Sequence, residues 1–289
     1  MKLVFLENDL VGGHYAEAYA GGAGVGLFLV IQGYANVVHL NDLDRSIYAF
    51  WHAVTQTPDD LCQLIETTDV NVKEWKRQRS MQKKLRGKRG LKKADLLKLG
   101  FSTFFLNRTN RSGIVRGGGV IGGLDQEGKW GIQSRYNKQT LLERIRRIAK
   151  CRDRIRIYNW DAAQFLRNKV PKLPTESLVY LDPPYYNNGD NLYQNDYTLE
   201  KHSEIANLVT DLNQNWIVSY DNADTIISLY SSYEPIVYNL SYSARRRYEG
   251  SEVMFACEDL KMPEFDNPAR ISKSRVRDRR EDYLSLTTS

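Results

Sequence analysis

The sequence predicts an α/β fold in which a mostly parallel sheet of seven strands carries an inserted, mainly helical domain. Short apolar and β-branched runs alternate along the chain with longer segments of helical periodicity. This alternation is typical of parallel sheets whose strands are joined by helices. It is interrupted between about residues 60 and 137, where no convincing strand occurs. A chain of 289 residues is long enough for one large domain with such an insertion.

The elements follow from the spacing of apolar residues, which alternate or run together in strands and recur every three or four positions in helices. The expected strands are residues 14–20, 36–41, 154–159, 177–182, 215–220, 233–240 and 251–258. The expected helices are residues 24–33, 43–56, 59–68, 72–85, 91–106, 138–150, 161–168, 198–213 and 223–230. The resulting organisation is a sheet domain (1–58 and 138–260), an inserted helical domain (59–137) and a basic C-terminal tail (261–289).

Composition excludes several classes of protein. The 42% of hydrophobic residues can form a substantial core, but no apolar run approaches the roughly 18 residues of a membrane span. The N-terminus does not read as a signal peptide. Cys62, Cys151 and Cys257 lie far apart, without the spacing of a zinc site or a disulfide framework. We therefore expect a cytoplasmic protein that needs no metal and has no membrane partner.

The basic residues are clustered. Residues 73–93 hold eleven lysines and arginines against one acid, and residues 269–280 form a second basic stretch. Such clusters favour a polyanionic partner, because each phosphate contact releases bound counterions. A solvated helix face or a disordered tail would give the same pattern. Charge alone therefore indicates nucleic acid binding without establishing it.

A glycine-rich loop follows the first predicted strand. Gly21, Gly22 and Gly24 lack side chains, so the backbone there can approach a ligand closely at the start of the next helix. Asp42 lies about 20 residues further on, at the tip of the second strand, where doubly wound folds place an acid on ribose hydroxyls. A structural turn and a helix cap are the alternatives. Together the elements predict a Rossmann-like sheet binding an adenosine-containing ligand, either a nicotinamide cofactor or S-adenosylmethionine.

The fourth predicted strand ends in the tetrapeptide Asp182-Pro183-Pro184-Tyr185. The prolines remove two backbone donors, fix φ and keep Asp182 out of helical geometry, which leaves carbonyl oxygens as acceptors. A carboxylate and an adjacent carbonyl can together accept both hydrogens of an exocyclic amine. Those bonds would hold the nitrogen as its lone pair leaves the ring, while Tyr185 stacks on the base. The pattern indicates chemistry on a nucleobase amine.

These motifs, in this order, resemble the DNA adenine methylase (Dam-like) family of adenine-N6-specific DNA methyltransferases. "AEAYAGGAGVGL", "LNDLD", "NWDAAQFL" and "DPPY" are similar to the family's successive motifs, and the resemblance runs from about residue 13 to 258. It implies S-adenosylmethionine as cofactor and Asp182, Pro183, Pro184 and Tyr185 as catalytic residues. The cofactor-binding residues it implies are Glu17, Tyr19, Gly21, Gly22, Gly24, Asp42, Asp161 and Asp182.

The insertion also resembles the family's target-recognition region. "FFLNRTNRSGIVRGGG" is similar to its N-R-x-x-x-[NS]-G stretch, and "GKWGIQSRYNK" to the hairpin that follows. The resemblance implies double-stranded DNA as partner. The DNA-contacting candidates are Asn107, Arg108, Arg111, Ser112, Lys129, Arg135, Asn137 and Lys138. Arginine suits guanine and asparagine suits adenine, but a phosphate contact or a loop-ordering hydrogen bond would also explain each residue.

The resemblance implies direct methyl transfer to the N6 amine of a flipped-out adenine, with no metal and no cysteine nucleophile. The D-P-P-Y chemistry also permits cytosine N4 or an RNA adenine as target. A non-catalytic DNA-binding relative is a third reading, because the segment preceding the first strand is short for this family. A second subunit that completes the cofactor pocket, or a restriction or defence-system partner, is compatible with the sequence.

Overall fold

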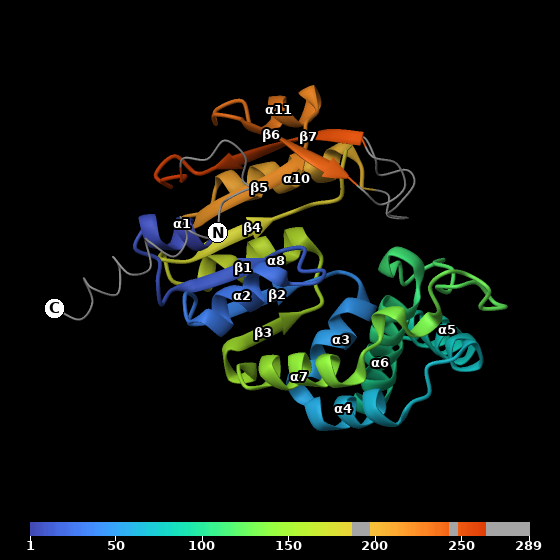
Figure 1. Cartoon of the computed structure of the whole chain (residues 1–289). Coiled ribbons are helices and arrows are strands. Elements are labelled where there is room, and N and C mark those ends of the chain that lie inside the picture. Colours follow the sequence, from blue (N-terminus) through green and yellow to red (C-terminus); the bar gives the residue numbers. More distant parts are fainter. Residues whose placement is uncertain (187–196, 243–247, 264–289) are drawn as a thin grey trace. The chain divides into compact units, whose positions relative to one another are not determined.

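The computed structural model describes residues 1–186, 197–242 and 248–263 (Figure 1). The basic stretch 269–280 and all but the start of the predicted tail 261–289 lie outside these residues. The chain divides into two compact units. The first comprises residues 1–41 and 160–289, and the second comprises Asp42–Asn159. The second unit is wider than the predicted insertion 59–137, which stays a prediction.

The seven-stranded, mostly parallel sheet is confirmed, with the strand order β3-β2-β1-β4-β5-β7-β6. β1 pairs in parallel with β2 and β4, and β4 pairs in parallel with β5, whereas β7 is antiparallel to both β5 and β6. Every predicted strand is present. The strands are β1 (His14–Glu17), β2 (Val37–Asn41), β3 (Ile155–Tyr158), β4 (Leu178–Leu181), β5 (Asn215–Asp221), β6 (Ile236–Tyr242) and β7 (Tyr248–Ala256).

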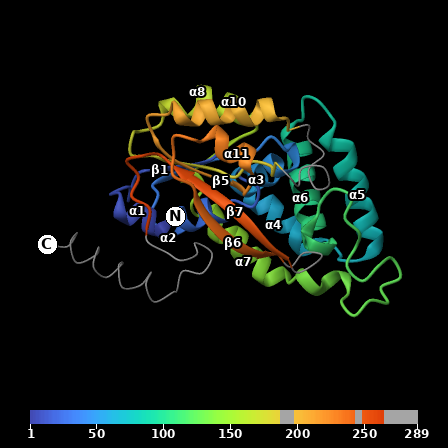
Figure 2. The same ribbon diagram turned by 90° about the horizontal axis from the view of Figure 1, so that it is seen from above.

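Helices cover both faces of the sheet in the first unit. Figure 2 shows α8 and α10 on one face and α1 and α2 on the other. Because helices cover both faces, neighbouring residues of β4 and β5 are buried on either side of the sheet, and both strands contain continuous apolar runs. The fully buried residues are Val179, Leu181, Ile217 and Val218. Among its described residues, the α-helices of this unit are α1 (Lys2–Glu7), α2 (Gly24–Gln32), α8 (Ala162–Asn168), α10 (Leu199–Thr210) and α11 (Asp224–Leu229).

The short helix α1 was not predicted. Its six residues are too few to display a helical period, so the sequence signal was a plain apolar run. Leu3, Val4 and Phe5 are buried, and the Phe5 ring lies 6.2 Å from that of Tyr15 on β1. The helix therefore belongs to the core behind the first strand.

The second unit is mainly helical. Within residues 60–137 the strand pairing is a single isolated bridge between Asn110 and Val120. The longer helices α5 and α6 carry the basic cluster and the recognition motif. The helices of this unit are α3 (Arg45–Gln56), α4 (Pro58–Thr67), α5 (Val72–Arg86), α6 (Lys93–Thr109) and α7 (Lys138–Ala149). None of the helices among the described residues is both long and apolar enough to cross a membrane.

Gly100 sets the approach of α6 to α3. A Cβ atom at this position would lie 2.4 Å from the carbonyl oxygen of Ala49 and 3.1 Å from the Cβ of Ala53. Since a backbone carbonyl cannot move aside cheaply, Gly100→Ala is expected to lower the free energy of unfolding by about 1–3 kcal/mol. Urea denaturation measures it. Gly87→Ala, also in a helical conformation but with nothing within 4 Å, is the matched control and should be neutral or slightly stabilising. Equal stability of the two variants would contradict the close approach.

Candidate active site

The first site element is the turn from β1 to α2, which a buried carboxylate holds. Glu17 ends β1 and is 5% exposed, and its Oε1 accepts the N–H of Gly26 at 3.0 Å. Burial raises the pKa of Glu17 to about 7, and the nearby Asp182 charge adds to the rise. A Cβ on Gly26 would lie 3.2 Å from Leu40, so this glycine permits close packing of α2 on the sheet. The "GGAGVG" spacing carried this signal, but Gly26 was not among the predicted residues.

The predicted loop glycines face open space. Added Cβ atoms on Gly21, Gly22 and Gly24 would meet nothing within 4 Å, and Gly21 has a φ of +46°. Gly24 begins the nine-residue helix α2, whose first N–H groups have no partner within the helix. A ligand with a carboxylate or phosphate group fits this geometry, because its oxygens can approach the backbone without a steric barrier.

A buried asparagine joins the strand ends of the first unit. Asn41, the last residue of β2, is fully buried, and its Nδ2 donates to the carbonyl oxygens of Ala18 at 3.0 Å and Trp160 at 3.1 Å. Its Oδ1 accepts the N–H of Trp160 at 3.0 Å. Ala18 precedes Tyr19, and Trp160 precedes Asp161, so one side chain fixes the backbone beside two predicted cofactor residues. Sequence reasoning missed Asn41, since its partner at Trp160 is 119 residues away.

Tyr19 and Asp161 directly follow the two backbone positions that Asn41 binds. Asp161 caps α8 by accepting the N–H of Ala163 at 2.9 Å. The hydroxyl groups of Tyr19 and Tyr197 are hydrogen-bonded, and their rings meet edge to face at 6.3 Å. Burial raises the pKa of Tyr19, and the Asp161 charge contributes to the rise. The pair therefore presents neutral aromatic rings next to a carboxylate.

Asp42 belongs to the second unit, whereas the other predicted cofactor residues belong to the first. Its Oδ1 accepts the N–H of Asp44 at 2.8 Å, and its own N–H donates to the carbonyl of Tyr158 on β3. Asp44, not Asp42, caps α3 through the N–H of Ser46. The helix-cap alternative for Asp42 is therefore wrong.

Asp182 follows the last residue of β4 at the centre of the sheet. The Ser219 hydroxyl on β5 donates to Asp182 Oδ1 at 3.2 Å and lies 2.7 Å from the hydroxyl of Tyr180. Solvent reaches the Asp182 side chain, yet protein groups surround it closely enough that burial raises its pKa to about 6. The Ser219 hydrogen bond opposes this rise, and the Glu252 charge adds to it. The carboxylate is thus mainly ionised at neutral pH but easily protonated below it.

Two acids fix the peptide that follows Asp182. The Tyr185 hydroxyl donates to Glu252 Oε1 at 2.6 Å, and the Tyr238 hydroxyl donates to Glu252 Oε2 at 2.8 Å. The N–H of Tyr186 donates to Asp221 Oδ1 at 2.7 Å. Asp221 and Glu252 face each other across the β5–β7 ladder and are both buried. Neither acid was predicted as a site residue, because the groups that they bind, on Tyr185 and Tyr186, are 67 and 35 residues away in the sequence.

The comparison with protein families identifies the class of methyltransferase. A model of the D12 class N6 adenine-specific DNA methyltransferases matches residues 5–244. The chain belongs to this family. It is an adenine-specific DNA methyltransferase, and the predicted resemblance is confirmed. Among solved structures it is similar to the rRNA methyltransferase aviRa from Streptomyces viridochromogenes, with 9% identity, 85% of this chain and 77% of that chain covered, and a TM-score of 0.32. Among curated proteins none matches the sequence.

In this methyltransferase the predicted DNA-contacting residues divide into two groups. Asn107, Arg108 and Arg135 order the loop after α6: Asn107 Nδ2 donates to the carbonyl of Gly113, and Arg108 donates to Asn107 Oδ1. Arg135 donates to the carbonyl oxygens of Asn107 at 2.8 Å and Asn110 at 3.4 Å.

The remaining candidates for DNA contact either lie at the start of α7 or are exposed to solvent. Asn137 caps α7 by accepting the N–H of Thr140 at 3.0 Å, and Lys138 Nζ donates to the carbonyl of Glu66 at 2.6 Å. Arg111, Ser112 and Lys129 are exposed to solvent. These three side chains are the ones among the candidates that are most available to DNA.

Proposed function

We propose that the protein transfers the methyl group of S-adenosylmethionine to the N6 amine of an adenine flipped out of double-stranded DNA. The observation that carries this proposal is the placement of Asp182 at the central strand end, beside a peptide fixed by Glu252 and Asp221. Membership of the adenine-specific family supports the target base. Extruding the base costs a few kcal/mol, which contacts to the DNA backbone and stacking in the site offset.

The peptide from Asp182 to Tyr185 would bind the N6 amine of the adenine. Ionised Asp182 and the Pro183 carbonyl accept its two hydrogens, which orients the nitrogen and lets its lone pair attack. Pro183 is buried, and it has no N–H that could compete for these acceptors. Tyr185 stacks on the adenine, and its hydrogen bond to Glu252 fixes the orientation of the ring.

The cofactor residues fit S-adenosylmethionine, which supplies a methyl group on a positively charged sulfonium. The open glycine loop suits the ligand's carboxylate, and the rings of Tyr19 and Tyr197 beside Asp161 tolerate a cation or an adenine. The residues of the first unit that are proposed to hold the cofactor are Glu17, Tyr19, Gly21, Gly22, Gly24, Asp161 and Asp182.

A direct assay tests the proposal. Purified protein is incubated with labelled S-adenosylmethionine and either unmethylated genomic DNA or RNA, modified bases are mapped by single-molecule sequencing, and cofactor binding is measured by calorimetry. We expect label in N6-methyladenine at a defined sequence. Label in N4-methylcytosine, label in RNA only, or cofactor binding without transfer would each refute the proposal in favour of a named alternative.

The rate should depend on the ionisation of Asp182. Because its pKa is about 6, the carboxylate gains a proton as pH falls through this value and then loses acceptor capacity. Single-turnover methylation is expected to be highest above about pH 7 and to fall roughly tenfold per pH unit well below pH 6. DNA binding measured over the same range is the control. A rate that stays constant from pH 8 to 5 would contradict the assignment.

A further inference from the structure

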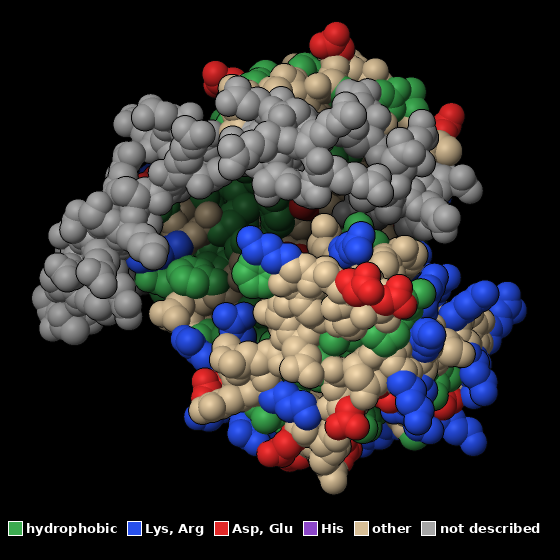
Figure 3. All heavy atoms as spheres, turned by 45° about the vertical axis from the view of Figure 1, so that its right-hand side comes forward, with side chains coloured by type: hydrophobic (Ala, Val, Ile, Leu, Met, Phe, Trp, Pro, Cys, Tyr) green, Lys and Arg blue, Asp and Glu red, His purple; other side chains and the backbone are tan. Residues whose placement is uncertain are grey.

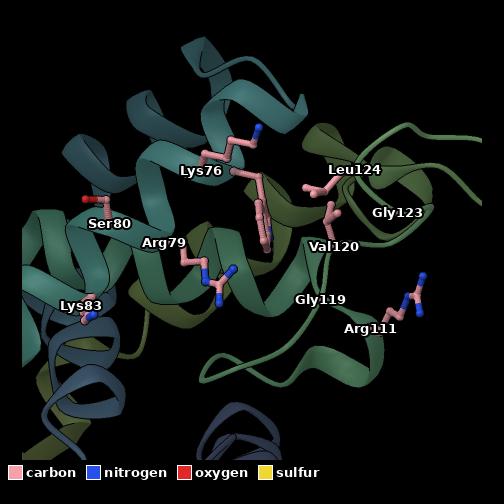
Figure 4. A pocket seen from close by; sticks show the side chains of 10 residues that line it. Lys76, Arg79, Ser80, Lys83, Arg111, Gly119, Val120, Gly123 and Leu124 are labelled. Atoms are coloured by element: carbon pink, nitrogen blue, oxygen red, sulfur yellow. The ribbon is translucent and has the colours of Figure 1, made fainter.

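The second unit contains a groove that the catalytic assignment does not use. It has a volume of about 620 Å³ and lies between α5 and the segment that follows α6 (Figure 4). Lys76, Arg79 and Lys83 come from α5, whereas Arg111 and Leu124 come from the opposite wall. All of its lining residues belong to the same unit.

The groove is cationic. Lys76, Arg79 and Lys83 are three and four residues apart, so they share one face of α5, and Arg111 adds a fourth positive charge. No acid is among the residues that line the groove. By contrast, Arg77 lies outside it and is paired with Glu74 at 2.7 Å. Figure 3 shows many Lys and Arg side chains over the surface of this unit.

Hydrogen bonds hold the walls of the groove. The buried Trp75 indole donates to Asn110 Oδ1 at 2.6 Å, and Asn110 Nδ2 donates to the carbonyl of Ile114 at 2.6 Å. The N–H of Arg111 donates to the carbonyl of Gly119 at 2.9 Å. The first of these bonds joins the two walls, and the other two order the segment that forms the wall opposite α5. The Arg79 guanidinium lies 5.2 Å from the centre of the Trp75 ring, so this cation is also positioned in advance.

We propose that this groove binds the sugar–phosphate backbone of duplex DNA away from the methylated base. Lys76 and Lys83 are seven residues apart, or roughly 10 Å along a helix, so the two side chains can contact different phosphates of one strand. A Cβ on Gly119 would meet nothing within 4 Å, so the opposite wall leaves room for a strand. The inference rests on the proposed function in that duplex DNA is the substrate.

The test compares two double variants of α5 with the same change of charge and the same spacing. Lys76→Gln/Lys83→Gln removes two cations that line the groove, and Arg77→Gln/Lys84→Gln removes two outside it. Fluorescence anisotropy measures the affinity of each full-length protein for a random-sequence duplex at several salt concentrations. The plot of log K against log salt has a negative slope. The groove variant is expected to reduce the magnitude of this slope by about 1.8, since each phosphate contact contributes about 0.9. The control should change the slope by less than half as much.

A third variant adds a negative charge instead of removing positive charges. Leu124→Glu adds an acid to the groove at a 55% exposed position, and Leu43→Glu does so at a 56% exposed position of the same unit outside the groove. Only Leu124→Glu should weaken binding. Thermal unfolding confirms that each variant folds. Equal slopes for the two double variants would overturn the proposal. An unchanged slope for the groove variant would also overturn it, and this is the result expected if the groove binds an acidic protein instead of DNA.

Failure of the groove and failure of the proposed function are distinguishable. Anisotropy needs no methyl donor, so it reports the groove even in a protein that transfers no methyl group. In an active enzyme, the groove variant should raise the KM for DNA and leave kcat unchanged. A fall in kcat at saturating DNA would contradict a role in backbone binding alone.

Discussion

Asp182→Asn is expected to lower the rate of methyl transfer by about 10³-fold and to leave DNA affinity close to that of the wild type. Asparagine keeps the size of the side chain and an oxygen that can accept the Ser219 hydrogen bond. It lacks the charge and the second acceptor oxygen that would stabilise the amine as its lone pair is released, and one such interaction is worth about 10²–10³ in rate. Single-turnover transfer of labelled methyl groups measures the loss, and Asp182→Ala should show it as well.

Stability separates this loss of activity from misfolding. The folded-state pKa of Asp182 is raised from 3.8 to about 6, so its ionisation costs stability, and the protein loses this stability as pH rises between these two values. Asp182→Asn removes this cost and should melt at or above the wild-type temperature at pH 8. Ser219→Ala serves as the milder control, since it removes one hydrogen bond to the carboxylate. Near-normal methylation by both Asp182 variants would mean that another group holds the amine.

Asn41→Leu is expected to lower the free energy of unfolding by about 3 kcal/mol and to weaken S-adenosylmethionine binding at least tenfold. The leucine fills a similar volume but leaves the carbonyl oxygens of Ala18 and Trp160 and the N–H of Trp160 without the partner they have now. Each unsatisfied buried group costs about 1–3 kcal/mol. The loss of affinity follows because Tyr19 and Asp161 directly follow the released backbone. Urea denaturation and calorimetric titration measure the two effects.

Asn215→Ala is the matched control for this variant. Asn215 lies at the opposite end of the sheet on β5, and its side chain donates one long bond of 3.5 Å to the carbonyl of Ser177. We expect a smaller destabilisation and unchanged cofactor affinity. If Asn41→Leu destabilises the protein while cofactor affinity stays at the wild-type level, Asn41 has a purely structural role.

The sequence carried most of the fold because its signals are local. Each predicted strand and helix is present, since apolar runs such as residues 178–181 indicate a strand and amphipathic segments such as α7 indicate a helix from neighbouring residues alone. The exceptions are also local: α1 is too short for a period, and β1 ends at Glu17, before the predicted limit of residue 20.

The site was only partly accessible by the same reasoning. Asp182 and the loop glycines stand in recognisable motifs, whereas Asn41, Asp221 and Glu252 act on backbone or hydroxyl groups far away in the sequence. No residue-level pattern marks such a partner. The predicted recognition region shows the converse: Asn107 and Arg135 lie in the two segments that resemble it, yet their hydrogen bonds in the structure order the loop itself.

The insertion of β7 between β5 and β6 has a consequence for biosynthesis. Glu252 anchors Tyr185 from a point 67 residues later in the chain, and it reaches that place only when β7 has paired with β5. A nascent chain that has emerged from the ribosome only as far as β5 cannot yet tether the tyrosine that follows the two prolines. DNA methylation would then be possible only after this strand has been synthesised and has paired with β5.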